Sequence, residues 1–194
     1  MNVRALSVAL LLALAACGQP AAAPEPPLAG AAIGGPFTLT DQNGRPRRDR
    51  DFAGRYRIIY FGYTYCPDVC PVDVANIGQA LRAFEKADPQ RGARVVPIFI
   101  TVDPARDTPA VLKQFVGNFH PRLIGLTGDE KTIDAVAKAY AIYIKRGARQ
   151  PGGGYLVDHS RQAYLMGPDG APMALLPADE GAAQVTAVLE QWVK

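Results

Sequence analysis

The chain contains short apolar stretches rich in β-branched and aromatic residues, and helical patterns follow them. The first stretch, residues 57–63, carries isoleucine, tyrosine and phenylalanine after a single arginine, and the second, residues 95–102, is rich in valine and isoleucine. Strands that are buried on both faces have this composition. Strands that alternate with helices build α/β domains. The pattern therefore predicts an α/β domain with a mixed sheet.

The other expected elements continue this alternation. Helical spacing predicts helices over residues 72–86, 109–118, about 130–140 and about 180–193, the last one capped by Asp179. Further strands are expected at residues 123–126, 155–158, 162–166 and 173–176. Residues 37–44 alternate and run into an Asn-Gly turn, which predicts an extra N-terminal β-hairpin. The order is compatible with a thioredoxin-like fold, in which helices flank a central mixed sheet.

Length and charge narrow the class of protein. The chain has 194 residues, 48% of them hydrophobic, which is enough for one sizeable core. Its net charge of +3 comes from 21 basic and 18 acidic residues without a run of lysine or arginine. Nucleic acid is therefore not expected as a partner.

The N-terminal residues have the features of an export signal. Arg4 precedes an apolar run over residues 5–16, which is too short to span a bilayer as a helix. Small residues lead into Cys17 and resemble a bacterial lipoprotein box. We expect a lipoprotein signal peptide at residues 1–16 and lipidation of Cys17; the alternative is an ordinary signal peptide cut elsewhere.

An Ala-, Pro- and Gly-rich tether follows at residues 17–36 and precedes a domain over residues 37–194. The lipid would anchor an exported protein that faces the periplasm or the outer side of the cytoplasmic membrane.

Two cysteines lie where the first predicted strand leads into a helix. Cys66 and Cys70 are four residues apart, so both thiols share one face if the backbone is helical there. Ligands bind at this end of strands in open α/β sheets, and a helix N-terminus favours thiolates. The pair has three interpretations: a structural disulfide, a redox pair that departs from the Cys-x-x-Cys spacing of thioredoxin-like reductases, or two soft ligands for copper.

A third ligand has two histidine candidates. His120 lies in a polar stretch after a predicted helix, which suggests a surface or capping residue. His159 directly follows a short apolar strand, in a loop that can fold back over the start of the cysteine helix. Spacing alone leaves open whether His159 is a ligand or only a satisfied histidine at a strand end.

Three segments together resemble the SCO/SenC family of copper-binding, thioredoxin-like proteins associated with cytochrome c oxidase assembly. They are residues 60–71, 103–109 and 157–160, and the match extends in the same order over residues 37–194. The resemblance implies that Cys66, Cys70 and His159 bind a copper ion. With three protein ligands and no fourth Cys or His in this set, the site is not a closed tetrahedral zinc site, and an open copper site that can release its ion fits better.

The resemblance implies a function as well. It implies a membrane-tethered metallochaperone that delivers copper to the dinuclear copper site of cytochrome c oxidase subunit II, with other periplasmic copper chaperones as further partners. The alternative is an enzyme, a thiol-disulfide oxidoreductase that reduces the cysteines of that subunit with Cys66 as the attacking thiol and Cys70 as its partner.

Several neighbouring residues have subsidiary expected roles. Asp158 is expected to orient His159 or to cap a local turn. The others are expected to shape the loop after the second strand and cap the next helix (Asp103, Asp107, Thr108), to flank the site as a docking surface (Tyr63, Tyr65), or to pack in the core (Met166, Met173).

Overall fold

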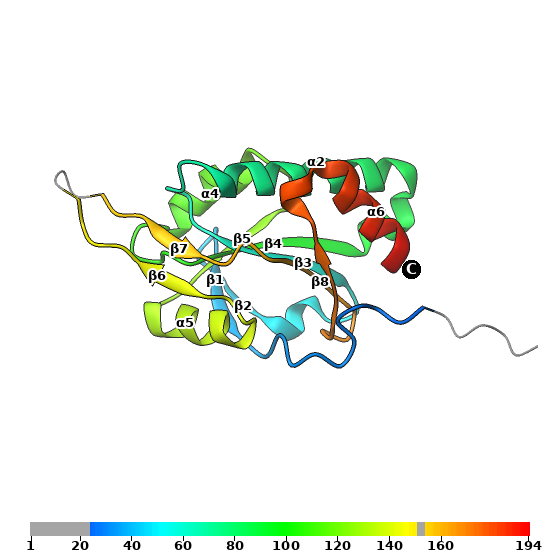
Figure 1. The fold of residues 1–194 in the computed structure, drawn as a ribbon, viewed down its shortest axis with the longest axis horizontal. Helices are drawn as coiled ribbons and strands as arrows, with labels where there is room; N and C mark the ends of the chain where they lie inside the picture. The colour runs from blue at the N-terminus through cyan, green and yellow to red at the C-terminus, as the bar shows by residue number, and fades with distance from the viewer. Residues whose placement is uncertain (1–23, 151–153) are drawn as a thin grey trace, which may run out of the picture.

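The computed structural model describes residues 24–150 and 154–194, and a seven-stranded mixed sheet forms its centre (Figure 1). The strand order is β2-β1-β5-β4-β3-β8-β9. The three inner strands, β3 (Tyr56–Gly62), β4 (Val95–Thr101) and β5 (Ile124–Thr127), are parallel. Every residue of β3 and β4 is buried, as expected for strands covered on both faces.

Antiparallel strands complete both edges of the sheet. On one side, β1 (Thr38–Asp41) pairs with β5 and with β2 (Pro46–Arg48), which confirms the predicted N-terminal hairpin. On the other side, β8 (Ala163–Met166) pairs with β3 and β9 (Pro172–Leu176) pairs with β8. The predicted mixed α/β architecture is therefore confirmed.

Helices cover both faces of the sheet (Figure 1). One face carries α2 (Val69–Ala87), α4 (Pro109–Gly117) and α6 (Ala182–Trp192), and the other carries α5 (Glu130–Ala139) and the 3-10 turn η1 (Asp49–Phe52). A short helix, α3 (Pro89–Ala93), follows α2, and a 3-10 turn, η2 (Ala178–Glu180), precedes α6.

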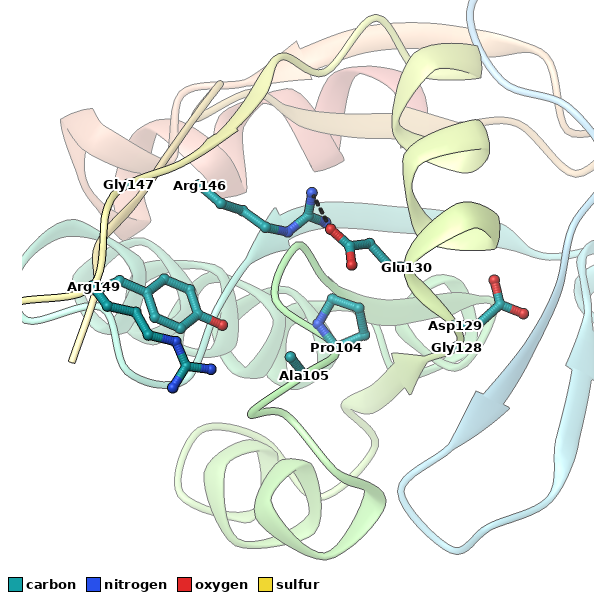
Figure 2. Close-up of a pocket in the computed structure, with 9 residues that line it drawn as sticks. Pro104, Ala105, Gly128, Asp129, Glu130, Arg146, Gly147 and Arg149 are labelled. Atoms are coloured by element: carbon teal, nitrogen blue, oxygen red, sulfur yellow. Dashed lines mark ion pairs between the residues drawn. The ribbon is translucent and has the colours of Figure 1, made fainter. Parts of the chain in front are cut away.

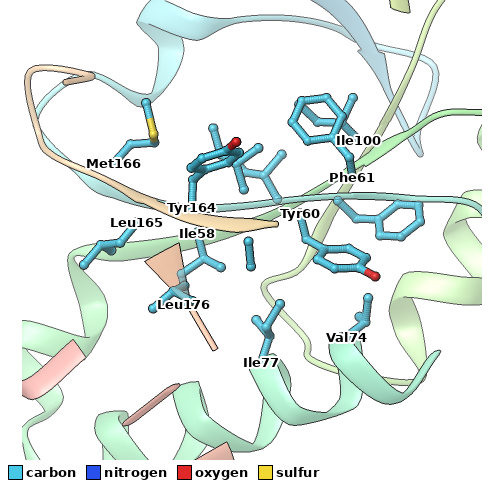
Figure 3. Close-up of a cluster of buried hydrophobic side chains, with 14 of the residues drawn as sticks. Ile58, Tyr60, Phe61, Val74, Ile77, Ile100, Tyr164, Leu165, Met166 and Leu176 are labelled. Carbon is cyan, nitrogen blue, oxygen red and sulfur yellow. The ribbon is translucent and has the colours of Figure 1, made fainter. Parts of the chain in front are cut away.

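Alternating side chains of β3 fill the two halves of the core (Figure 3). Tyr60 points toward α2, and Phe61 points to the opposite face, where its ring lies 5.4 Å from that of Tyr140. Both side chains are almost wholly buried. Because β3 is packed on both faces, it holds the first residues of the following loop in a fixed position.

Three local expectations differ from the structure. α6 begins at Ala182 after Gly181, whose φ is +106°, so Asp179 does not cap it. α2 begins at Val69, three residues earlier than expected. A separate two-stranded ribbon of β6 (Ile144–Arg146) and β7 (Val157–His159) extends beyond the sheet, and its first strand was not expected.

Part of the Ala-, Pro- and Gly-rich segment contacts the domain. Leu28 donates a backbone hydrogen bond to Met173 in β9, and Gly34 donates one to Ala139 at the end of α5. The side chains of Leu28 and Ile33 pack against the core. The signal peptide predicted for residues 1–16 and the lipidated Cys17 lie outside the described residues. Within residues 24–150 and 154–194, no helix has the length and apolar character needed to cross a membrane.

Candidate metal centre

The two cysteines lie at the carboxyl end of β3, as predicted, but not on one helical face. Cys66 sits in a turn, where its backbone N–H donates to the Tyr63 carbonyl over 3.2 Å. Cys70 is the second residue of α2, because the helix begins only at Val69. Cys66 is half-buried, Cys70 is fully buried, and both are free thiols.

The structure brings His159 to Cys70 across 89 residues of sequence. The Cys70 Sγ atom lies 3.3 Å from His159 Nε2. The other ring nitrogen, Nδ1, is 2.8 Å from the Ser160 carbonyl oxygen, to which it can only donate. This contact fixes the tautomer with a free Nε2 lone pair that faces the sulfur. An imidazole held in this way is ready to accept a proton or to bind a metal.

Tyr63 holds the His159 segment against the cysteine turn. Its ring meets the His159 ring edge-on, with centroids 5.9 Å apart and an interplanar angle of 84°. Its hydroxyl accepts a hydrogen bond from the backbone N–H of Val157 at the start of β7, over 3.4 Å. Tyr63 is buried, so of the two flanking tyrosines only Tyr65, which is 54% exposed, offers surface to a partner.

The two thiols have different electrostatic environments. Partial burial disfavours the Cys66 thiolate, but backbone hydrogen bonds at the start of α2 outweigh that effect and lower the pKa of Cys66. Burial, together with the neighbouring Cys66, raises the pKa of Cys70 to about 12. Burial also lowers the pKa of His159, which favours the neutral imidazole that metals require.

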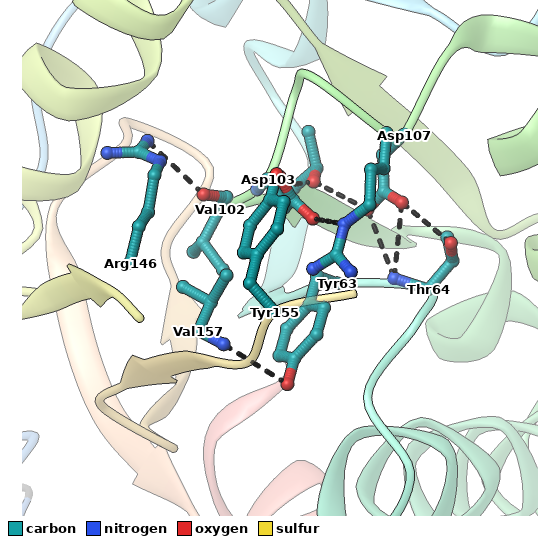
Figure 4. A network of polar contacts seen from close by, with 10 residues as sticks. Tyr63, Thr64, Val102, Asp103, Asp107, Arg146, Tyr155 and Val157 are labelled. Atoms are coloured by element: carbon teal, nitrogen blue, oxygen red, sulfur yellow. Dashed lines mark hydrogen bonds and ion pairs between the residues drawn. The ribbon is translucent and has the colours of Figure 1, made fainter. Parts of the chain in front are cut away.

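Buried polar contacts fix the loop after β4 beside the cysteine turn (Figure 4). The Asp107 carboxylate accepts hydrogen bonds from the Thr64 backbone and hydroxyl and, over 2.6 Å, from the hydroxyl of Thr101. The Asp103 carboxylate accepts one from the Tyr155 hydroxyl over 2.5 Å. These contacts confirm the expected loop-shaping role of both aspartates.

Arg106 and Thr108 complete this loop. Arg106 pairs with Asp103 and lies 3.7 Å from the centroid of the Tyr155 ring. Thr108 caps α4, as expected, by accepting the backbone N–H of Val111.

Sequence reasoning missed a buried network below Cys70. Asp73, one turn further along α2, accepts hydrogen bonds from the hydroxyl of Tyr60 over 2.9 Å and from Arg161 over 2.8 and 3.2 Å. Asp73 is fully buried. Its place on the same helical face as Val74 and Ile77 was the available signal, because an acid among core positions needs a partner.

Other candidate residues lie apart from the site. His120 is buried rather than on the surface: its Nδ1 accepts the Arg122 backbone N–H, and its Nε2 lies 3.4 Å from Glu85. The side chain of Asp158 is exposed, and Ser160 provides the hydrogen-bond partner of His159 instead. Met166 is buried and Met173 packs against the core, as expected.

The donor set suits copper, although the described residues contain no preassembled group of three or more His, Cys, Asp or Glu side chains around a metal position. Two thiolates and an imidazole are soft and borderline ligands of the kind that Cu(I) prefers, and they also tolerate Cu(II). The Cys70–His159 pair is in contact, and Cys66 lies in the turn directly before α2. Cys66, Cys70 and His159 remain the predicted ligands.

A separate hollow of about 450 Å³ lies beyond Tyr155 (Figure 2). It is bounded by the loop at residues 104–105, the start of α5 and the β6–β7 ribbon, and an ion pair of 3.1 Å between Arg146 and Glu130 crosses one side. None of the three predicted ligands lines it. The candidate metal centre is therefore a small contact site rather than this hollow.

Comparison with known proteins identifies similar chains. The SCO1/SenC family model matches residues 25–194. The chain is 48% identical over 141 residues to protein SenC of Rhodobacter capsulatus. The aligned region covers 72% of this chain and 61% of that protein. It spans about half the length of the curated relatives that it matches.

Two solved structures of related proteins contain copper. ScoI of Arabidopsis thaliana with copper bound is 37% identical, with a TM-score of 0.76 over 82% of this chain and 98% of that one. ScoI of Bradyrhizobium japonicum with copper bound is 41% identical, with a TM-score of 0.74 over 83% of this chain and 99% of that one.

Proposed function

This chain belongs to the SCO1/SenC family, and we propose that it is a membrane-tethered copper metallochaperone whose ligands are Cys66, Cys70 and His159. It delivers copper to the dinuclear copper site of cytochrome c oxidase subunit II from the periplasmic or outer side of the membrane. The Sco family is one of cytochrome c oxidase assembly proteins. Copper is the cargo of this activity rather than a permanent cofactor.

One observation carries the proposal. The side chains of Cys70 and His159, which are 89 residues apart, meet at 3.3 Å through the nitrogen that can coordinate a metal. The two related ScoI structures that hold copper support the choice of metal. Cys66 is only half-buried, so a partner protein can reach this ligand. We expect the ligand that the partner can reach to be the first to be exchanged.

Copper binding and release follow from the environment of each ligand. Deprotonation of Cys70 is unfavourable in the empty protein, since burial raises its pKa to about 12. A bound cation supplies the missing positive charge and displaces the proton. Removal of the ion returns the proton to the buried Cys70 thiol, which keeps that buried position uncharged in the empty protein.

The proposed anchor accounts for the N-terminal segment. A lipidated Cys17 would hold the chain at the membrane surface, and residues 18–27 would separate the anchor from Leu28, where contacts with the domain begin. Other periplasmic copper chaperones are the proposed donors of the ion.

A second function has its own supporting observation. Cys66 is accessible and has a lowered pKa, whereas Cys70 is buried with a raised pKa. These are the properties of an attacking and a resolving thiol. The Cys66 thiolate would attack a disulfide of the subunit and form a mixed disulfide with it. The Cys70 thiolate would then attack the Cys66 sulfur and displace the thiolate of the subunit. The substrate leaves as a dithiol, and the chain is left with a Cys66–Cys70 disulfide.

Competition with a Cu(I) chelator distinguishes the two functions. His159→Gln removes the imidazole but keeps a polar side chain, and His120→Gln is the matched control at the other histidine. We expect His159→Gln to weaken copper retention while dithiol oxidation by a model disulfide is unchanged, and His120→Gln to leave both unchanged. Equal retention in all three proteins would refute the copper site, and uptake of no copper by the reduced wild type would refute delivery.

A further inference from the structure

A second contact runs parallel to the Cys70–His159 contact. Asp73 lies three residues after Cys70 on α2, and Arg161 lies two residues after His159. The Arg161 guanidinium meets the Asp73 carboxylate through both ends of its fork, with Nη2 2.8 Å from Oδ1 and Nε 3.2 Å from Oδ2. Two elements that are distant in sequence are thus joined twice, once through the proposed ligands and once through this pair.

Burial makes the Asp73–Arg161 pair strong and specific. The Asp73 side chain is 1% exposed, and the Arg161 side chain is 44% exposed. A carboxylate so far from water needs its partners, because an unpaired buried charge is strongly destabilising. The hydroxyl of Tyr60 is the other hydrogen-bond partner. Any movement of the Arg161 segment away from α2 would leave Asp73 with that single neutral donor.

The pair is mechanically linked to the cysteine. The Tyr60 hydroxyl donates to Asp73. A Cβ atom at Gly62 would lie 2.9 Å from the Tyr60 ring and 3.2 Å from Cys70 Sγ, so the Tyr60 ring and the Cys70 thiol are packed around Gly62 without free space. Asp73 is thus joined through Tyr60 to the packing around Cys70.

We propose that the Asp73–Arg161 pair is a positioning clamp that holds His159 against Cys70 and thereby sets how firmly the chain retains copper. This inference rests on the proposed copper function. Neither residue coordinates the ion. The clamp keeps the segment 157–161 seated on α2, so that the imidazole is already in place when copper arrives and leaves only if the segment lifts. Because Arg161 is partly exposed, a docking partner can reach it and loosen the clamp.

The geometry requires arginine rather than a general positive charge. The fork of a guanidinium contacts both carboxylate oxygens at once, whereas a lysine ammonium supplies one point charge. Arg161→Lys should therefore rescue only part of the effect of Arg161→Met. Lys145→Met is the matched control, because Lys145 is exposed on β6 and its loss removes the same charge from the ribbon next to Arg161.

The decisive experiment is a double-mutant comparison of copper retention against a Cu(I) chelator. Loss of an outer contact that orients a metal ligand costs about 10–100-fold in affinity. We expect a loss of this order in Arg161→Met, less in Arg161→Lys and none in Lys145→Met. We also expect His159→Gln to cost much less in the Arg161→Met background than in the wild type, because the clamp acts through His159. An equal cost in both backgrounds would overturn the proposal.

A measurement without copper separates failure of the clamp from failure of the proposed function. In the apo protein, amide hydrogen exchange over residues 157–161 should be faster in Arg161→Met than in the wild type, while exchange over β4 is unchanged. The double variant Asp73→Asn/Arg161→Met, which leaves no unpaired buried charge, should show the same local increase. Unchanged exchange over residues 157–161 in both variants would refute the clamp whether or not the wild type binds copper.

Discussion

Cys66 and Cys70 should differ strongly in their reactivity toward iodoacetamide in the reduced apo protein. Burial raises the pKa of Cys70 to about 12, so about 10⁻⁵ of it is thiolate at pH 7. A cysteine with a pKa of 9.0 is about 1% thiolate at pH 7, and the pKa of Cys66 is lowered from that value. The thiolate fractions therefore differ by at least about 1,000-fold.

Intrinsic nucleophilicity reduces this difference. A thiolate of higher pKa is the stronger nucleophile, with a Brønsted coefficient of about 0.4–0.5, which returns a factor of about 20 to Cys70. The expected ratio of rates is then about 50-fold in favour of Cys66. Because Cys70 is also fully buried, this ratio is a lower bound.

Mass spectrometry of timed samples measures both rates in one protein. The two cysteines lie on one peptide after many digests, so Cys66→Ser and Cys70→Ser variants assign the signal. The rate for Cys66 should level off at a lower pH than for a free thiol, since its pKa is lowered. If Cys70 reacted as fast as Cys66 at pH 7, the assignment of attacking and resolving thiols would be refuted.

Three further variants test packing and buried polar groups in the domain. Gly62→Ala should destabilise the fold by about 1–3 kcal/mol in urea unfolding, because its Cβ would meet core aromatic rings at 2.9 and 3.0 Å; Gly117→Ala, with nothing within 4 Å, should not. Asp107→Ala leaves buried donors unpaired and should cost about 1–3 kcal/mol, whereas the exposed Asp158→Ala should be neutral. Burial lowers the pKa of His120 despite nearby Glu85, so its contribution to stability is complete above the unfolded pKa of about 6.5 and is lost as the pH falls. His120→Gln should therefore lose less stability than the wild type between pH 7.5 and pH 5.5; an equal loss would contradict this assignment.

The sequence was sufficient for the sheet and its main helices. The apolar runs at β3 and β4 are long and contain Arg57 as their one charged residue, so burial on both faces was the expected interpretation. The β6 strand was missed because Ile144–Arg146 carries two basic residues and gains its structure from pairing with β7. Its own composition carries no strand signal.

Less of the candidate site could be predicted from the sequence. Spacing placed the cysteines at the carboxyl end of β3, but only family resemblance singled out His159, because a contact across 89 residues leaves no local pattern. His120 was assigned to the surface or to a cap from its polar neighbours, yet it is buried, with its Nδ1 accepting the Arg122 backbone N–H and its Nε2 3.4 Å from Glu85. A polar segment is thus a poor guide when its side chains have partners elsewhere in the fold.

X-ray absorption at the copper edge of the Cu(I)-loaded protein tests the central claim most directly. We expect two sulfur ligands and one nitrogen ligand in the wild type, no nitrogen ligand in His159→Gln, and one sulfur ligand fewer in either Cys66→Ser or Cys70→Ser. A nitrogen ligand that persists in His159→Gln, or a sulfur count that either serine variant leaves unchanged, would contradict a copper site built from these three residues.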